Sequence, residues 1–284
     1  MYQQNESNES NESNELNIYE STQLEKIKDF KNEIPSVISQ GIGTALKPLT
    51  YLTEKIIPEA AIKGALDFSN SAAKWLTDID DIKRDAKVTN IEELRYVDLE
   101  LCDNLADEVH NWAIGIASAE GGVVGVLGIA GMAADFPAII TLALRTIHKI
   151  GICYGYESKT ELDNQFVLGI LSASGANSVK EKEMALLTLK NIETMLIKQS
   201  WKTMAKKAAE QQLSKEGIVI AIKNLAKQLG INLTKRKALQ AIPVIGAGIG
   251  ATVNGWYIKE IGWAARRMFQ ERWLIENGKM IEIE

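Results

Sequence analysis

The sequence predicts an all-α fold: a single multi-helix domain with a central glycine-rich helical hairpin and a disordered N-terminal tail. Three observations predict it. The 284 residues include only five prolines, and few runs alternate apolar and polar residues as strands do. Several helix starts also carry a capping box, in which two residues three positions apart satisfy each other's backbone N–H groups. With 46% hydrophobic and 24% charged residues, the composition is that of a globular protein with a sizeable core.

The first element is the tail. Residues 5–15 read NESNESNESNE, a repeat too polar to pack. We therefore expect residues 1–20 to be disordered and residues 21–284 to form the domain. No apolar signal sequence opens the chain, and the two cysteines have neither the number nor the spacing of a disulfide framework or metal motif. A reducing compartment is the expected location.

The helices follow in order, placed by apolar periodicity and by their caps. The capping boxes are Thr89–Glu92, Ser158–Glu161 and Ser178–Glu181. We interpret Pro137 and Pro243 as breaks, each followed by a new helix. The predicted helices are 20–33, 34–47, 49–76, 90–119, 123–133, 136–154, 159–174, 179–212, 215–229, 234–241, 244–252 and 254–277.

Two glycine-rich segments differ from the rest of the sequence in their almost complete lack of charged residues. Residues 121–144 are uncharged except for Asp135, and residues 238–258 carry no formal charge. A membrane-spanning helix needs about 20 apolar residues, and prolines or glycines interrupt both segments. Glycines four residues apart let helix backbones approach closely. Each segment therefore predicts a helix–turn–helix hairpin that packs tightly or dips into a bilayer, and we favour packing or peripheral contact over a span.

An acidic face is predicted on the helix 90–119. Glu100, Asp103, Asp107 and His110 fall on one side of it at helical spacing. Carboxylates and imidazole can ligate a divalent metal, so Asp103, Asp107 and His110 are candidate metal ligands. Di-metal bundles repeat Glu-x-x-His on a second helix, and no such repeat is found. We favour a solvated acidic face, and we expect no metal.

A second candidate site surrounds the glycine hairpin. Its residues are Glu120, Asp135, Arg145, His148 and Tyr154. Arg145 and His148 are three residues apart, so they share a helix face. A carboxylate buried beside the hairpin needs a cation, and Arg145 is the natural partner of Asp135. The functional alternative is a polar pocket with His148 as acid or base. We favour the structural alternative, an internal salt bridge with Asp135 as a helix cap.

The net charge and its distribution limit the classes of molecule that the protein is expected to bind. A net charge of -5 and a pI near 5.4 argue against general nucleic-acid binding. Residues 198–237 are rich in lysine, and the helix 254–277 mixes tryptophans with arginines. Such a helix suits a membrane interface, or a core helix whose arginines face water. No glycine cluster has the strand or the GK[ST] that a nucleotide site requires, so no cofactor is expected.

Several motifs carry a family resemblance. LCDNLADEVHNWAIGIASAEGGVVGVLGIAGMAADFPAIITLALRTIHKIGICYGYE, residues 101–157, and TKRKALQAIPVIGAGIGATVN, residues 234–254, strongly resemble the EcsC protein family. The resemblance covers roughly residues 90–270. It implies a bacterial, intracellular helical protein that works near the membrane. It assigns no catalytic residue.

Three functions follow as hypotheses. The first, which we favour, is a non-enzymatic protein that contacts a lipid surface or a membrane protein, located in the cytoplasm or at the inner face of the membrane. The second is a hydrolase or metal-dependent enzyme with a polar site at the hairpin mouth. The third is a soluble scaffold or a toxin/immunity-type partner.

Overall fold

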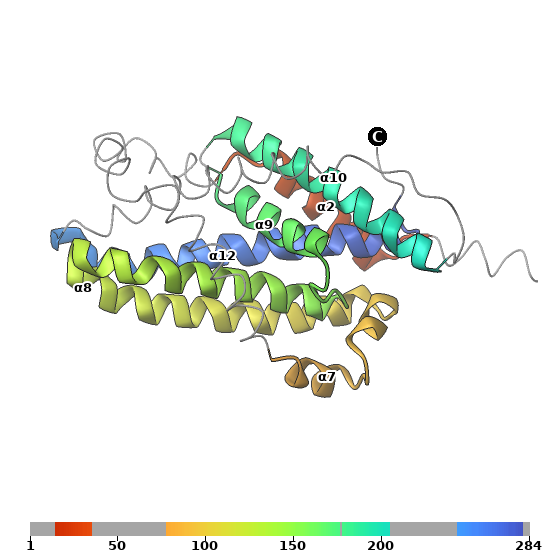
Figure 1. The fold of residues 1–284 in the computed structure, drawn as a ribbon, viewed down its shortest axis with the longest axis horizontal. Helices are drawn as coiled ribbons and strands as arrows, with labels where there is room; N and C mark the ends of the chain where they lie inside the picture. Colours follow the sequence, from red (N-terminus) through yellow and green to blue (C-terminus); the bar gives the residue numbers. More distant parts are fainter. Residues whose placement is uncertain (1–14, 36–77, 177, 205–242, 281–284) are drawn as a thin grey trace, which may run out of the picture.

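The computed structural model describes residues 15–35, 78–176, 178–204 and 243–280; for residues 120–138, 201–204 and 243–253 it describes the backbone alone. Every regular element in these ranges is helical, which confirms the all-α class. Figure 1 shows the arrangement. The elements are α2 (Ile18–Asn32), α7 (Asp80–Ala86), the 3-10 helix η1 (Ile91–Tyr96), α8 (Leu99–Cys153), α9 (Glu161–Ser174), α10 (Val179–Met204) and α12 (Pro243–Glu276).

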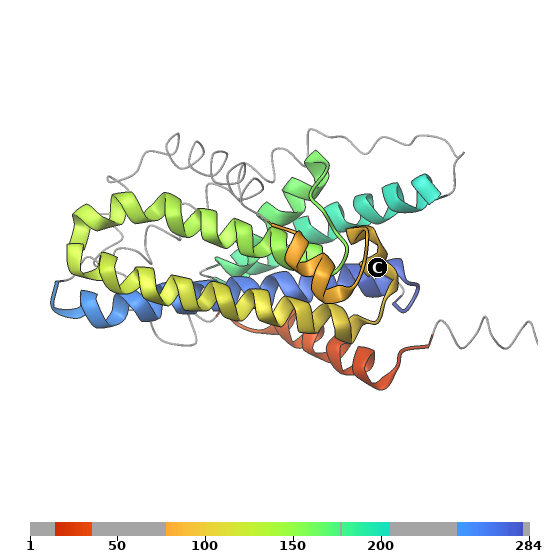
Figure 2. The ribbon, with the colours of Figure 1, turned by 90° about the horizontal axis from the view of Figure 1, so that it is seen from below.

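The longest element, α8, folds back on itself although its helical backbone continues throughout (Figure 2). In a straight helix Trp112 and Arg145 would be about 50 Å apart at 1.5 Å per residue. The Arg145 guanidinium instead lies 4.9 Å from the Trp112 ring centre, and Tyr154 donates a hydrogen bond to Asp103. Both pairs are centred between residues 128 and 129, so the reversal falls in the glycine-rich segment.

Close packing of the glycine faces at this reversal stays a prediction, because those side chains are outside the described part. The breaks expected there are wrong. Residues 90–119, 123–133 and 136–154 were predicted as three helices, whereas the backbone is helical without interruption from Leu99 to Cys153. Proline lacks the N–H of an interior hydrogen bond, yet helical structure continues past Pro137 near the bend.

Helix α12 is the central helix and runs antiparallel to the first half of α8 (Figures 1 and 2). Gln270 binds Asp103, Arg266 binds Asp107, and Gly255 lies against Ser118. Each step forward along α8 matches an equal step backward along α12. The predicted break near residue 253 is therefore wrong, because one helix extends from Pro243 to Glu276.

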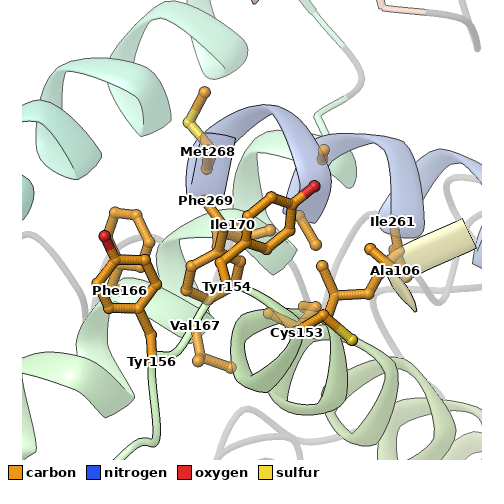
Figure 3. Packing of buried hydrophobic residues seen from close by; sticks show 14 of the residues in the cluster. Ala106, Cys153, Tyr154, Tyr156, Phe166, Val167, Ile170, Ile261, Met268 and Phe269 are labelled. Atoms are coloured by element: carbon orange, nitrogen blue, oxygen red, sulfur yellow. The ribbon is translucent and has the colours of Figure 1, made fainter. Parts of the chain in front are cut away.

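The aromatic core gathers around Phe269 of α12 (Figure 3). The Phe269 ring centre is 6.3 Å from that of Tyr154, 5.9 Å from that of Tyr156 and 5.4 Å from that of Phe166. These partners come from the end of α8, the following turn and α9. Gly151 of α8 permits the approach, since a Cβ there would lie 2.6 Å from the Phe269 ring. The core thus joins α8, α9 and α12.

The helix starts match the predicted caps only in part. Glu181 donates its N–H to Ser178 Oγ at 3.2 Å, as predicted. The other two capping boxes are shifted and use Asn90 with Glu93, and Thr160 with Asp163. The spacing of residues in the sequence did not show which of two neighbouring capping boxes forms.

Two further differences concern the start of one helix and a helix that was missed. Helix α2 begins at Ile18, inside the predicted tail, because Asn17 and Glu20 form a capping box. Helix α7 was not predicted at all. The helices predicted at 34–47, 49–76, 215–229 and 234–241, most of the tail and the end of helix 179–212 lie outside the described residues. Within the described part, no helix combines the length and apolarity needed to cross a bilayer.

Candidate functional site

A buried carboxylate, that of Asp103, is the centre of a polar network. It is 1% exposed and accepts hydrogen bonds from the Tyr154 hydroxyl, from the Tyr19 hydroxyl at 2.6 Å and from Gln270 Nε2 at 2.7 Å. Burial and the bond to Asp103 raise the pKa of the Tyr19 hydroxyl. These donors are uncharged, and they come from α2, α12 and the residue after α8. Their hydrogen bonds to Asp103 hold α2, α12 and the residue after α8 against α8.

The network continues to a buried cation. Arg267 is 7% exposed, and its Nη1 donates to Gln270 Oε1 at 2.7 Å and to Gln23 Oε1 at 3.0 Å. Burial, and then the neighbouring charge of Arg266, lower the pKa of Arg267. Unsatisfied buried charges are costly, so the two glutamines stabilise the position of this guanidinium. They also tie α2 to α12.

The second carboxylate of the predicted metal face has a different partner. Asp107 forms an ion pair with Arg266, whose side chain is 5% exposed while that of Asp107 is 49% exposed. Arg266 also lies over the Trp263 ring, with Cζ 4.7 Å from its centre. This pair sits at the edge of the network and fixes α12 against α8.

His110 is buried and uncharged. Its Nε2 donates to the carbonyl oxygen of Lys259 at 3.0 Å, and its ring meets that of Trp263 edge-on at 5.6 Å. It is 2% exposed, and burial lowers its pKa to about 4. In this tautomer Nε2 carries the donated proton, so Nε2 offers no lone pair to a metal.

The predicted metal ligands thus share one helix but not one site. Asp103, Asp107 and His110 each bind a different group of α12. In the ranges that the structure describes, no three His, Cys, Asp or Glu side chains are placed to hold a metal ion. The predicted face is also less solvated than expected, because Asp103 and His110 are both buried.

The residues predicted at the hairpin mouth have separate partners as well. Tyr154 joins Asp103, His148 Nδ1 lies 2.8 Å from Ser158 Oγ, and Arg145 lies over Trp112. Glu120 and Asp135 belong to the part of α8 whose side chains lie outside the description. The predicted Asp135–Arg145 salt bridge therefore stays a prediction.

The chain's two cysteines, Cys102 and Cys153, are both buried. Burial raises the pKa of Cys102 to about 12 and raises that of Cys153 as well. A thiolate is the reactive form of cysteine. Neither thiol is therefore activated as a nucleophile.

Sequence reasoning missed the buried arginines of α12. The sequence suggested either an interfacial helix or a core helix whose arginines face water, but Arg266, Arg267 and Arg272 are only 4%, 7% and 4% exposed. Arg272 binds Glu276 at 3.0 Å and lies 4.0 Å over the Tyr156 ring. The sequence did contain a signal for buried arginines. Glu276 follows Arg272 by four residues, and the helix is rich in aromatic residues, so both kinds of partner for a buried cation are present.

One end of the bundle is made of uncharged sequence. The matched steps of α8 and α12 place Pro243, 12 residues before Gly255, level with residue 130, beside the reversal of α8. Residues 121–134 and 243–253 contain no Asp, Glu, Lys, Arg or His. Figures 1 and 2 both show the start of α12 beside the reversal. We call these two segments the uncharged end.

Comparisons with known proteins point to one family. The profile of the EcsC protein family matches residues 21–274. A protein of Bacillus subtilis (strain 168) described as "uncharacterized protein YdbA" is 25% identical over 195 residues, which are 69% of this chain and 66% of that protein. "Protein EcsC" of the same organism is 24% identical over 57% of this chain and 60% of its own length. The matched region spans less than two thirds of either relative. No solved structure matches.

Proposed function

This chain belongs to the EcsC protein family, and from that premise we propose that it is a non-enzymatic protein that contacts a membrane surface through its uncharged end. The observation that carries the proposal is the placement of two uncharged segments, 121–134 and 243–253, at the same end of the bundle. Elsewhere the bundle mixes charges of both signs. The asymmetry between its ends supports contact with an apolar environment at one end.

The length of the uncharged end sets the depth of contact. Glu120 and Asp135 are the first charged residues on either side of the reversal. From Glu120 to the turn between residues 128 and 129 the helix rises about 13 Å, and from Asp135 about 10 Å, at 1.5 Å per residue. Interfacial helices bury their apolar faces by about 5–10 Å, whereas the hydrocarbon core is about 30 Å thick. The proposal is therefore a shallow contact at the interface.

The chemistry of the described residues supports a non-enzymatic role. The chain has two histidines and two cysteines, and all four are buried. His110 and His148 contact protein groups, and the thiol pKa values are raised. The commonest general base and the strongest nucleophile are thus engaged in packing. The enzyme alternative has less support than membrane contact.

Vesicle flotation tests the proposal. The full chain is mixed with phosphatidylcholine vesicles, with or without phosphatidylglycerol, at low and high salt. We expect flotation with both, because the proposed contact, residues 121–134 and 243–253, contains no lysine or arginine that would favour anionic lipid. Leu127→Glu places a charge beside the reversal, and we expect it to reduce the bound fraction about fivefold or more.

The matched control is Leu187→Glu on α10, a leucine that is already 63% exposed. We expect this variant to float like the parent chain. Failure of the parent chain to float on either vesicle would refute the proposal and favour the scaffold alternative. Equal losses for both variants would show that the uncharged end is not the contact.

A further inference from the structure

A cavity of about 370 Å³ lies between α7 and the two halves of α8. Its apolar lining includes Ile82, Leu105 and Ala113, which are buried core residues. Trp112, half exposed, forms part of the wall. The volume is in the range of small-molecule sites in proteins. Trp112 is some 16 residues, or about 24 Å of helix, from the reversal of α8, so this cavity is distinct from the uncharged end.

The cavity contains a cation that no described carboxylate neutralises. Arg145 lines it and lies over the Trp112 ring. Its Nε is buried and has no hydrogen-bond partner among the residues that the structure describes, and a desolvated donor without an acceptor is energetically unfavourable. The other cation of the lining, Lys149, is already paired with Asp81. Arg145 is therefore the group that favours an anionic ligand atom.

Carboxylates of the same lining oppose a simple anion. Asp78 and Glu108 line the cavity and are exposed, and neither forms a salt bridge within the described part of the chain. A free anion drawn to Arg145 would meet their repulsion, and a free cation drawn to them would meet that of Arg145. A ligand with one charge of each sign satisfies both.

We propose that this cavity binds a small zwitterion. Its anionic group accepts hydrogen bonds from the Arg145 guanidinium, and its ammonium group faces the carboxylates of Asp78 and Glu108. Bidentate recognition of carboxylate or phosphate is typical of arginine. A phosphate joined to an amine by a short linker has this chemistry, and it exists both as a soluble compound and as a phospholipid headgroup.

Calorimetric titration of the full chain tests the proposal with O-phosphoethanolamine as the probe. Inorganic phosphate and ethanolamine, each with one half of the chemistry, are the comparison ligands. We expect the zwitterion to bind at least tenfold more tightly than either. No binding of O-phosphoethanolamine at millimolar concentration, or equal binding of phosphate alone, would overturn the proposal.

Single variants test the cation and the carboxylates of the cavity one at a time. We expect Arg145→Gln and Glu108→Gln each to weaken binding about tenfold or more, while Glu183→Gln, an exposed glutamate on α10, leaves it unchanged. Glu108 is exposed, so its variant stays informative if Arg145→Gln fails to fold. Unchanged affinity in Glu108→Gln would refute the role of the carboxylates.

A last arm distinguishes the two sources of the ligand. Vesicles containing phosphatidylethanolamine are added as competitor in the O-phosphoethanolamine titration, with phosphatidylcholine vesicles as the control. Competition by phosphatidylethanolamine alone assigns the site to the lipid headgroup, and no competition assigns it to the soluble zwitterion. Leu127→Glu is tested in parallel. If this variant no longer floats with vesicles but still binds O-phosphoethanolamine, the cavity and the proposed membrane contact are separate sites.

Discussion

Gly262 of α12 is predicted to be intolerant of even a methyl group. A Cβ at this position would lie 2.1 Å from Cδ2 and 2.2 Å from Nε2 of His110. His110 has little room to move, since it is 2% exposed, bonded to the Lys259 carbonyl and packed against Trp263. Gly262→Ala must displace the imidazole and break that hydrogen bond.

The magnitude follows from three opposing effects. Overpacking a core costs about 1–3 kcal/mol, and the lost hydrogen bond about 0.5–1.5 kcal/mol. Replacing a helical glycine by alanine returns about 1 kcal/mol. We therefore expect Gly262→Ala to lower the free energy of unfolding by about 1–3 kcal/mol, measured by urea denaturation followed by circular dichroism.

Two companion variants make the reasoning refutable. A Cβ at Gly115 of α8 would meet no atom of the described residues within 4 Å, so Gly115→Ala should be neutral or stabilising by up to about 1 kcal/mol. In a His110→Ala background, Gly262→Ala should lose most of its cost, because the obstructing ring is gone. If Gly262→Ala and Gly115→Ala have equal stability, the close approach of the two helices is wrong.

Three further outcomes follow from the same contacts. Asp103→Asn should lower the free energy of unfolding by about 2–4 kcal/mol in urea denaturation, because the new amide N–H₂ would face hydroxyl donors such as that of Tyr154; an unchanged midpoint would contradict the network. His110 has a folded pKa of about 4, below its unfolded value near 6.5, so its contribution is complete above pH 6.5 and is lost as pH falls toward 4. Between pH 7.0 and pH 4.5, the free energy of unfolding should fall by about 2–3 kcal/mol more in the parent chain than in His110→Gln. Gly155→Ala should reduce the melting temperature, since Gly155 has a φ of +85° and a Cβ there would lie 2.7 Å from the Arg95 backbone nitrogen; an unaltered melt would refute that strain.

The fold class was predictable because helix signals are local. Capping residues and apolar periodicity act within one or two turns, so α9 and α10 were placed at nearly their observed starts. The path of α8 was not predictable in the same way. Pro137 and the neighbouring glycines read as helix breaks, but whether a chain breaks or bends at such residues depends on the tertiary packing around it.

The candidate site was predictable in composition but not in pairing. Asp103, Asp107 and His110 were correctly placed on one helix, and this helical face was interpreted as solvated. Whether such a face is exposed depends on the complementary face of another helix. Here Arg266 and Gln270 of α12 supply the partners, and these lie more than 150 residues away, where no local spacing rule reaches.

The central position of α12 has a consequence for folding during synthesis. The two halves of α8, together with α9, α10 and α2, leave the ribosome before α12 does. The aromatic residues that contact Phe269, and Gln23, which accepts from Arg267, therefore lack these partners until α12 emerges. A topology with such distant contacts folds slowly, and the early helices expose apolar surface in the meantime. Nascent chains arrested before residue 243 should therefore recruit chaperones more strongly than chains that extend past residue 280.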